Sequence, residues 1–134
     1  MAVIRDWLAL AVLSIGLACS TTPSRPPPPA VDVASGDPAS VLGRFTAALQ
    51  EGRWEEAYAL LSARWRARST PTRLAGDLAA SGAAGREAME RVRALLASGA
   101  RLAVSGPAAS LRVAEGRSAR LSLEDGAWRV DALE

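Results

Sequence analysis

The chain has 134 residues and a net charge of only +2, with sixteen arginines but no lysine and no histidine. Without histidine or lysine, it has no Ser-His-Asp or Cys-His catalysis, no imidazole metal ligand, no Schiff-base lysine and no P-loop lysine. The small net charge predicts no strongly basic surface for nucleic acid. We therefore expect a protein with no metal, no cofactor and no nucleic-acid partner.

The N-terminus carries an apolar run of signal-peptide length. Arg5 precedes residues 7–17, which are almost wholly apolar and, at about 1.5 Å per residue, too short to cross a ~30 Å hydrocarbon core. They have the dimensions of a secretory h-region. The only cysteine, Cys19, follows this run.

The segment Leu17-Ala18-Cys19 resembles the lipobox of bacterial lipoproteins, in which the cysteine is acylated and becomes the first residue of the mature chain. The resemblance implies a signal peptide over residues 1–18, lipidation at Cys19 and a membrane anchor in the cell envelope. A serine rather than an aspartate at position 20 implies the periplasmic face of the outer membrane. The alternative is an ordinary signal peptide that is cut after another small residue, so that Cys19 is lost or is left as an unmodified thiol.

Residues 19–37 are predicted to be a tether. Five of the eight prolines lie here, among Ser, Thr and Gly, and large apolar side chains are almost absent. Such a segment cannot bury enough surface to fold. In a polyproline conformation, at about 3.1 Å per residue, it would hold a domain on the order of 50 Å from a membrane.

Residues 38–134 form one candidate domain, which begins with helical patterns. Asp37-Pro38 predicts a capped first helix that Gly52 closes, with inward side chains Val41, Leu42, Phe45, Ala48 and Leu49. A second helix is expected from about Trp54, with one stripe formed by Trp54, Tyr58, Leu61 and Trp65. Thr70-Pro71 predicts a short third helix, Ser81 to Gly85 a helix-breaking loop, and Ala84 to Ser98 a fourth helix with Met89, Val92, Leu95 and Leu96 inward.

The period then changes to two, which predicts strands. Apolar positions alternate at Leu102/Val104, Leu111/Val113, Ala119/Leu121/Leu123 and Trp128/Val130. Gly106-Pro107, Glu115-Gly116 and Asp125-Gly126 lie between them as tight turns. Four short strands joined in this way predict an antiparallel meander, and helices followed by a sheet predict an α+β fold.

Two segments carry a resemblance to a known fold family. Residues 45–62 (FTAALQEGRWEEAYALLS) are similar to the opening helices of NTF2-like domains, and residues 121–131 (LSLEDGAWRVD) to their closing hairpin. The resemblance implies a cone in which a curved four-stranded sheet wraps a long helix and leaves an open cavity. Because such domains include enzymes as well as binding and dimerisation modules, the fold does not select a function.

Two groups of residues are candidate sites. Trp54, Tyr58, Leu61, Trp65 and Trp128 would line a pocket for a flat apolar molecule, or else belong to the core. Arg64, Arg66, Arg68 and Arg73, with no acidic residue between Ala57 and Gly76, would bind an anionic partner, or else form a solvated helix end.

We find no catalytic residue to assign. Ketosteroid isomerase of the same superfamily uses an Asp base with Tyr and Asp donors, but here Asp77 lies on a helix, Asp125 in a turn, and Asp131 is expected to point away from the apolar face. We expect a lipid-anchored, non-catalytic module that binds an envelope partner or a small apolar ligand. The alternatives are a small isomerase or hydratase that uses a carboxylate, and an adaptor that forms a homodimer through its sheet.

Overall fold

A computed structural model describes residues 36–134 of the chain. The expected signal peptide, Cys19 and the tether up to residue 35 lie outside the described residues. The helices are α1 (Pro38–Gln50), α2 (Trp54–Ala59), α3 (Ala63–Arg66) and α4 (Pro71–Ala97), and the strands are β1 (Ala103–Ser105), β2 (Ala108–Ala114), β3 (Arg117–Glu124) and β4 (Ala127–Leu133). The predicted α+β class is confirmed.

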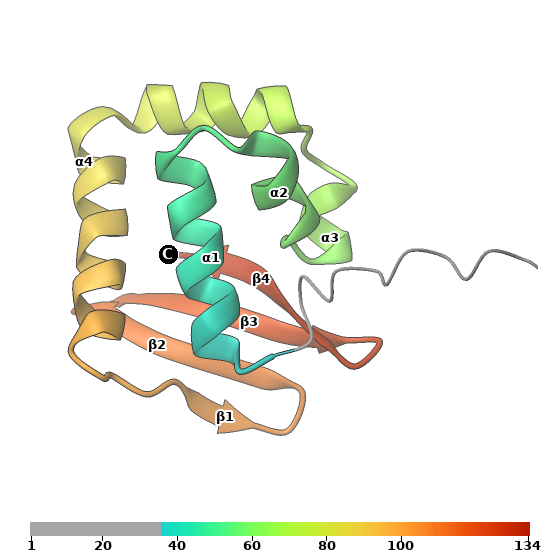
Figure 1. Cartoon of the computed structure of the whole chain (residues 1–134), viewed down its shortest axis with the longest axis vertical. Helices are drawn as coiled ribbons and strands as arrows, with labels where there is room; N and C mark the ends of the chain where they lie inside the picture. The colour runs from blue at the N-terminus through green and yellow to red at the C-terminus, as the bar shows by residue number, and fades with distance from the viewer. Residues whose placement is uncertain (1–35) are drawn as a thin grey trace, which may run out of the picture.

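The four strands form one antiparallel sheet in the order β1-β2-β3-β4, which is the predicted meander. In Figure 1, α1 crosses one face of this sheet, and the two halves of α4 meet at a corner beyond it. The first half of α4 passes over the ends of α1 and α2, and the second half runs down beside α1 (Figure 1).

Helix α1 has the predicted bounds and the predicted buried face. The Asp37 carboxylate accepts a hydrogen bond from the Ser40 backbone N–H at 3.3 Å, and Pro38 occupies the first turn, where its missing N–H costs nothing. All five apolar residues predicted to face inward are buried. Gly52, with φ 70°, follows the helix as predicted.

The predicted second helix is wrong beyond Ala59. The chain leaves the helix in a turn at Leu60, makes a bridge to Val130 at Leu61, is extended at Ser62, and then forms the separate short helix α3. In this segment, the Val130 N–H donates to the Leu60 carbonyl at 2.8 Å, and the Ser62 N–H donates to the Val130 carbonyl at 2.9 Å. Because these bonds satisfy backbone groups on the edge strand β4, pairing with the sheet replaces helix continuation. The predicted stripe is therefore divided: Trp54 and Tyr58 lie in α2, Leu61 in the bridge to β4, and Trp65 in α3.

The predicted third and fourth helices are confirmed as two helical segments, which meet at a kink at Gly82 and together carry the label α4. Thr70 caps it, accepting from the Arg73 N–H at 3.1 Å, and the helical path runs to Ala97 apart from Gly82, whose φ 56° and ψ −136° are not helical. The predicted helix-breaking segment, Ser81 to Gly85, thus contains the break, at which Gly82 leaves the helical conformation and the helix direction changes. In the second half of α4, Arg91 pairs with Glu87 one turn earlier, at 3.2 Å.

We expect Gly82→Ala to lower the free energy of unfolding by about 1–3 kcal/mol, because only glycine adopts this backbone conformation without strain. A Cβ at Gly82 would meet nothing within 4 Å, so the loss would come from the backbone alone. Chemical denaturation measures it. Gly76→Ala is the matched control, since Gly76 is helical with open space around its Cβ position, and it should gain about 0.5–1 kcal/mol. Equal effects at both positions would contradict the bend.

The three predicted turns are confirmed. Asp125 and Gly126 both have positive φ, as a two-residue hairpin turn requires. The prediction for the first strand is only partly right: β1 is exposed along its length, with Val104 57% accessible, because no helix covers this edge of the inner face. At the opposite edge, the bridge from Leu61 covers β4.

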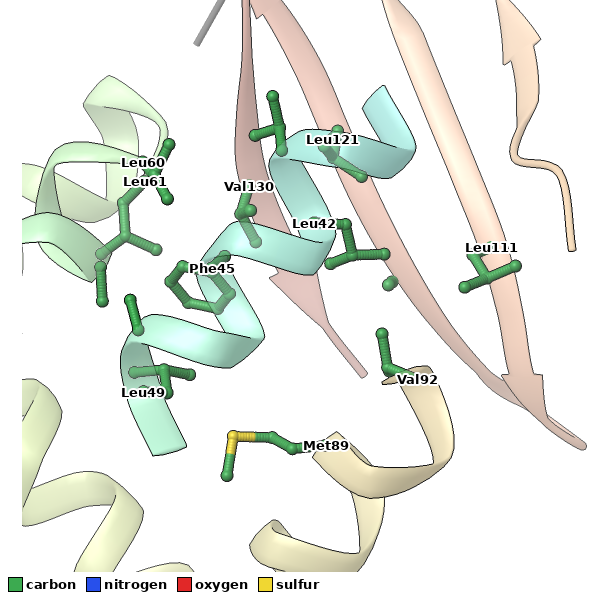
Figure 2. Close-up of a cluster of buried hydrophobic side chains, with 14 of the residues drawn as sticks. Leu42, Phe45, Leu49, Leu60, Leu61, Met89, Val92, Leu111, Leu121 and Val130 are labelled. Carbon is green, nitrogen blue, oxygen red and sulfur yellow. The ribbon is translucent and has the colours of Figure 1, made fainter. Parts of the chain in front are cut away.

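The core lies between α1, the second half of α4 and the inner face of the sheet. Figure 2 shows side chains from these three layers converging. The largest fully buried residues include Leu42 of α1, Leu60 after α2, and Leu121 and Val130 of the sheet. No helix within residues 36–134 combines the length and the apolar character needed to cross a bilayer.

Candidate ligand cavity

A cavity of about 480 Å³ lies where the C-terminal half of α1, both halves of α4 and the ends of β2, β3 and β4 meet. This volume is in the range of small-molecule sites. Its wall is mainly apolar, formed by Phe45, Leu49, Leu61, Leu74, Leu78, Ala84, Ala88, Met89, Val92, Val113, Ala119 and Val130.

The bend in α4 creates this space. In a straight helix, Leu74 and Val92 would lie about 27 Å apart along the axis, at about 1.5 Å per residue, whereas here Leu74 and Leu78 before Gly82 and Met89 and Val92 after it line the same cavity. At the corner the lining side chains are small. A Cβ at Gly85 would lie 2.6 Å from Ser81 Cβ, so only glycine permits this close approach. Ser81 and Gly85, which flank the bend at Gly82, are thus also residues of the cavity wall.

Exposed apolar side chains mark the cavity mouth. Trp65 is 42% accessible and Leu133 is 45% accessible, and both line the cavity. The Trp65 indole N–H donates to the Asp131 backbone carbonyl, which fixes the ring beside β4. An exposed aromatic ring held in place at an apolar opening favours contact with an apolar molecule.

The charged residues that line the cavity are mostly paired. Asp77 lies 3.8 Å from Arg73, Arg91 is 3.2 Å from Glu87, Asp131 is 2.9 Å from Arg64, and Glu134 is 2.9 Å from Arg120. Within residues 36–134, Arg117 is the one charged lining residue that has no ion pair.

The predicted pocket residues divide into two groups. Leu61 and Trp65 line the cavity, whereas Trp54, Tyr58 and Trp128 are half-buried against the core and are not in its wall. The Tyr58 hydroxyl donates to the Arg66 carbonyl at 3.0 Å and so attaches α3 to α2. Some lining residues, among them Met89 and Val92, were predicted as the inward face of a helix, but their role in the cavity depends on the bend, which periodicity does not describe.

The predicted arginine patch is partly neutralised. Arg64 binds the Asp131 carboxylate, and Arg73 pairs with Asp77. Arg66 and Arg68 make no ion pair within the described part of the chain. Part of the positive charge therefore serves to hold α3 on the sheet.

Asp131 lies in a β-bulge. Leu121 pairs with Val130 and Arg120 pairs with Ala132, so Asp131 is the extra residue on β4. Its carboxylate accepts from the buried Ser62 hydroxyl at 2.8 Å and from Arg64, and this network fixes α3 to β4. As predicted, Asp125 is a turn residue.

No cluster of three metal-ligating side chains occurs within residues 36–134. Comparison with protein families, with curated proteins and with solved structures finds no match to this chain. The function of this chain must therefore be inferred from the residues that line the cavity.

Proposed function

We propose that this protein is a lipid-anchored binding module of the cell envelope that holds a small apolar ligand without chemistry. The observation that supports the ligand most directly is the apolar cavity of about 480 Å³ beneath the bend of α4. Met89 and Val92, both buried, form its wall beside α1. An apolar wall with few polar groups suits a ligand whose binding depends on burial of hydrocarbon.

The proposal includes a fold of the NTF2-like kind. Its support is the order of helices before a four-stranded meander, the placement of helices on one face of the sheet, and an opening between the sheet and the helices. The bulges at Val113 in β2 and Asp131 in β4 add local bending to the two strands that end at the cavity. Curved strands around a helix are what a cone requires.

We prefer a ligand to the sheet-mediated dimer because of the outer face of the sheet. Successive side chains of a strand point to opposite faces of the sheet, and those of β2 and β3 that point to the outer face are Ser110, Arg112, Ser118, Arg120 and Ser122. In a two-fold dimer through this face, identical patches meet, so arginines of both copies would approach one another. The apolar cavity offers a larger gain from burial than this polar surface does.

The ligand part is tested by fluorescence. The full chain is titrated with dodecanol below its solubility limit, and we expect a saturable change in tryptophan emission, because Trp65 lines the mouth. In Trp65→Phe, the change should shrink while binding measured by calorimetry persists. Wild-type emission and heat that do not saturate would contradict the proposal.

The anchor part is tested by mass spectrometry of protein extracted from membranes. We expect a chain that begins at Cys19 and carries acyl groups, since two or more acyl chains give firm attachment. Replacement of Cys19 by Ser should release the protein from the membrane fraction. An intact, unacylated chain in the cytosolic fraction would contradict the anchor and leave the cavity proposal unaffected.

A further inference from the structure

We further propose, resting on the proposed function, that the ligand is a single-chain amphiphile with an anionic head group, and that the Arg117 guanidinium binds this head group. The cavity wall would hold the hydrocarbon chain. Fatty-acid-like carboxylates have this chemistry.

The position of Arg117 follows from the pleat of β3. Alternate residues of a strand share a face, and Arg117, Ala119 and Leu121 are alternate residues. Ala119 and Leu121 are buried on the inner face, so Arg117 lies at the exposed end of the same row. Both Arg117 and Ala119 line the cavity, which places the guanidinium at the end of an apolar wall.

The charge balance of the cavity favours an anion. The lining carboxylates Asp77, Asp131 and Glu134 are each paired with an arginine, and the lining Arg91 is paired with Glu87. Among the described side chains that line the cavity, Arg117 is therefore the charged one with no side chain of opposite charge within ion-pair distance. An anionic head group would compensate it, whereas a cationic one would be repelled.

The chemistry of the guanidinium favours a carboxylate. Its planar N–H groups match two carboxylate oxygens, and such charge-assisted hydrogen bonds are about twice as strong as neutral ones. Because Arg117 is exposed, salt should screen the attraction. The hydrocarbon contribution to binding should not weaken with salt.

The test compares three probes that share a dodecyl chain: dodecanoate, dodecanol and dodecyltrimethylammonium. Dodecanol is titrated into the full chain below its solubility limit and the two ionic probes below their micelle concentrations, and binding is measured by calorimetry. We expect dodecanoate to bind most tightly and dodecyltrimethylammonium most weakly. In Arg117→Gln, dodecanoate should bind roughly tenfold more weakly, the loss of one charged hydrogen-bonding contact, while dodecanol is unchanged.

Arg112→Gln is the matched control. Arg112 is exposed, makes no ion pair within residues 36–134, and lies on the outer face, where it pairs in register with Ser118. Arg112→Gln removes the same charge from the neighbouring strand and should leave the affinities for all three dodecyl probes unchanged. An equal loss in both variants would overturn the assignment to Arg117.

The outcomes separate this inference from the proposed function. If dodecanol and dodecanoate bind equally and Arg117→Gln changes neither, the cavity binds apolar ligands but the head-group assignment is wrong. If dodecyltrimethylammonium binds most tightly, the charge argument is wrong. If none of the probes binds, the proposed function itself fails.

Discussion

Leu42→Ala should lower the free energy of unfolding by about 3–4 kcal/mol. Leu42 is fully buried in α1 and lies within the core that α1, α4 and the sheet share. Truncation leaves a void that these layers cannot close without shifting toward one another. Since small domains have a total stability of about 5–15 kcal/mol, this one change removes a large share of it.

The measurement is urea denaturation followed by both far-ultraviolet circular dichroism and tryptophan fluorescence. Because one core joins helices and sheet, the two signals should shift together. Leu123→Ala is the control, since it deletes the same atoms at a side chain that is 40% accessible, and it should cost less than about 1 kcal/mol. Separate helix and sheet transitions would contradict a single core.

Ala88→Phe should weaken dodecanol binding at least tenfold, about 1.4 kcal/mol of binding free energy, because the added ring would occupy the cavity. Ala88 lies in the second half of α4 and lines the cavity. The stability of the fold should change by less than about 1 kcal/mol, since the ring enters space that is not already packed. Calorimetric titration and urea denaturation measure the two effects.

Ala94→Phe is the matched control for this variant. Ala94 is an exposed residue of the same half of α4 and does not line the cavity. The substitution adds the same ring outside the site, so dodecanol affinity should be unchanged. If Ala88→Phe binds dodecanol as tightly as Ala94→Phe does, the ligand does not occupy this cavity.

The sequence predicted the secondary structure best where a pattern is compatible with only one local conformation. Asp37-Pro38 and Thr70-Pro71 mark helix starts because each combines a side-chain cap with a proline that needs no partner for its nitrogen. The change to period two after Gly99 marked the sheet. Asp125-Gly126 marked a hairpin because both residues accept positive φ.

The second helix could not be predicted correctly because its end depends on a distant strand. Residues 54–65 have helical spacing throughout, but the backbone of Leu60 and Ser62 bonds to Val130, some seventy residues away. The spacing of apolar residues in one segment carries no information about hydrogen bonds to a distant strand. The predicted pocket assumed that the second helix continues to Trp65. Because the helix ends at Ala59, only Leu61 and Trp65 of the five predicted residues lie in the cavity wall.

The cavity itself depends on three-dimensional geometry. The glycines at positions 82 and 85 signalled an interruption, but an interruption gives neither the direction of the bend nor what lies beneath it. Arg117 is one of sixteen arginines in the sequence. It became distinctive only when its place on the inner face and the pairing of the other lining charges were known.

Contact between a bound hydrocarbon chain and Met89 would test the cavity most directly. Met89 is buried in the cavity wall, and Met1 is the only other methionine, so labelling of the methionine methyl groups gives two signals, which Met89→Leu assigns. With dodecanol bound to the full chain, we expect nuclear Overhauser contacts from the Met89 methyl group to the probe, with saturation at one molecule per chain. Saturable binding without such contacts would place the ligand elsewhere and contradict the account.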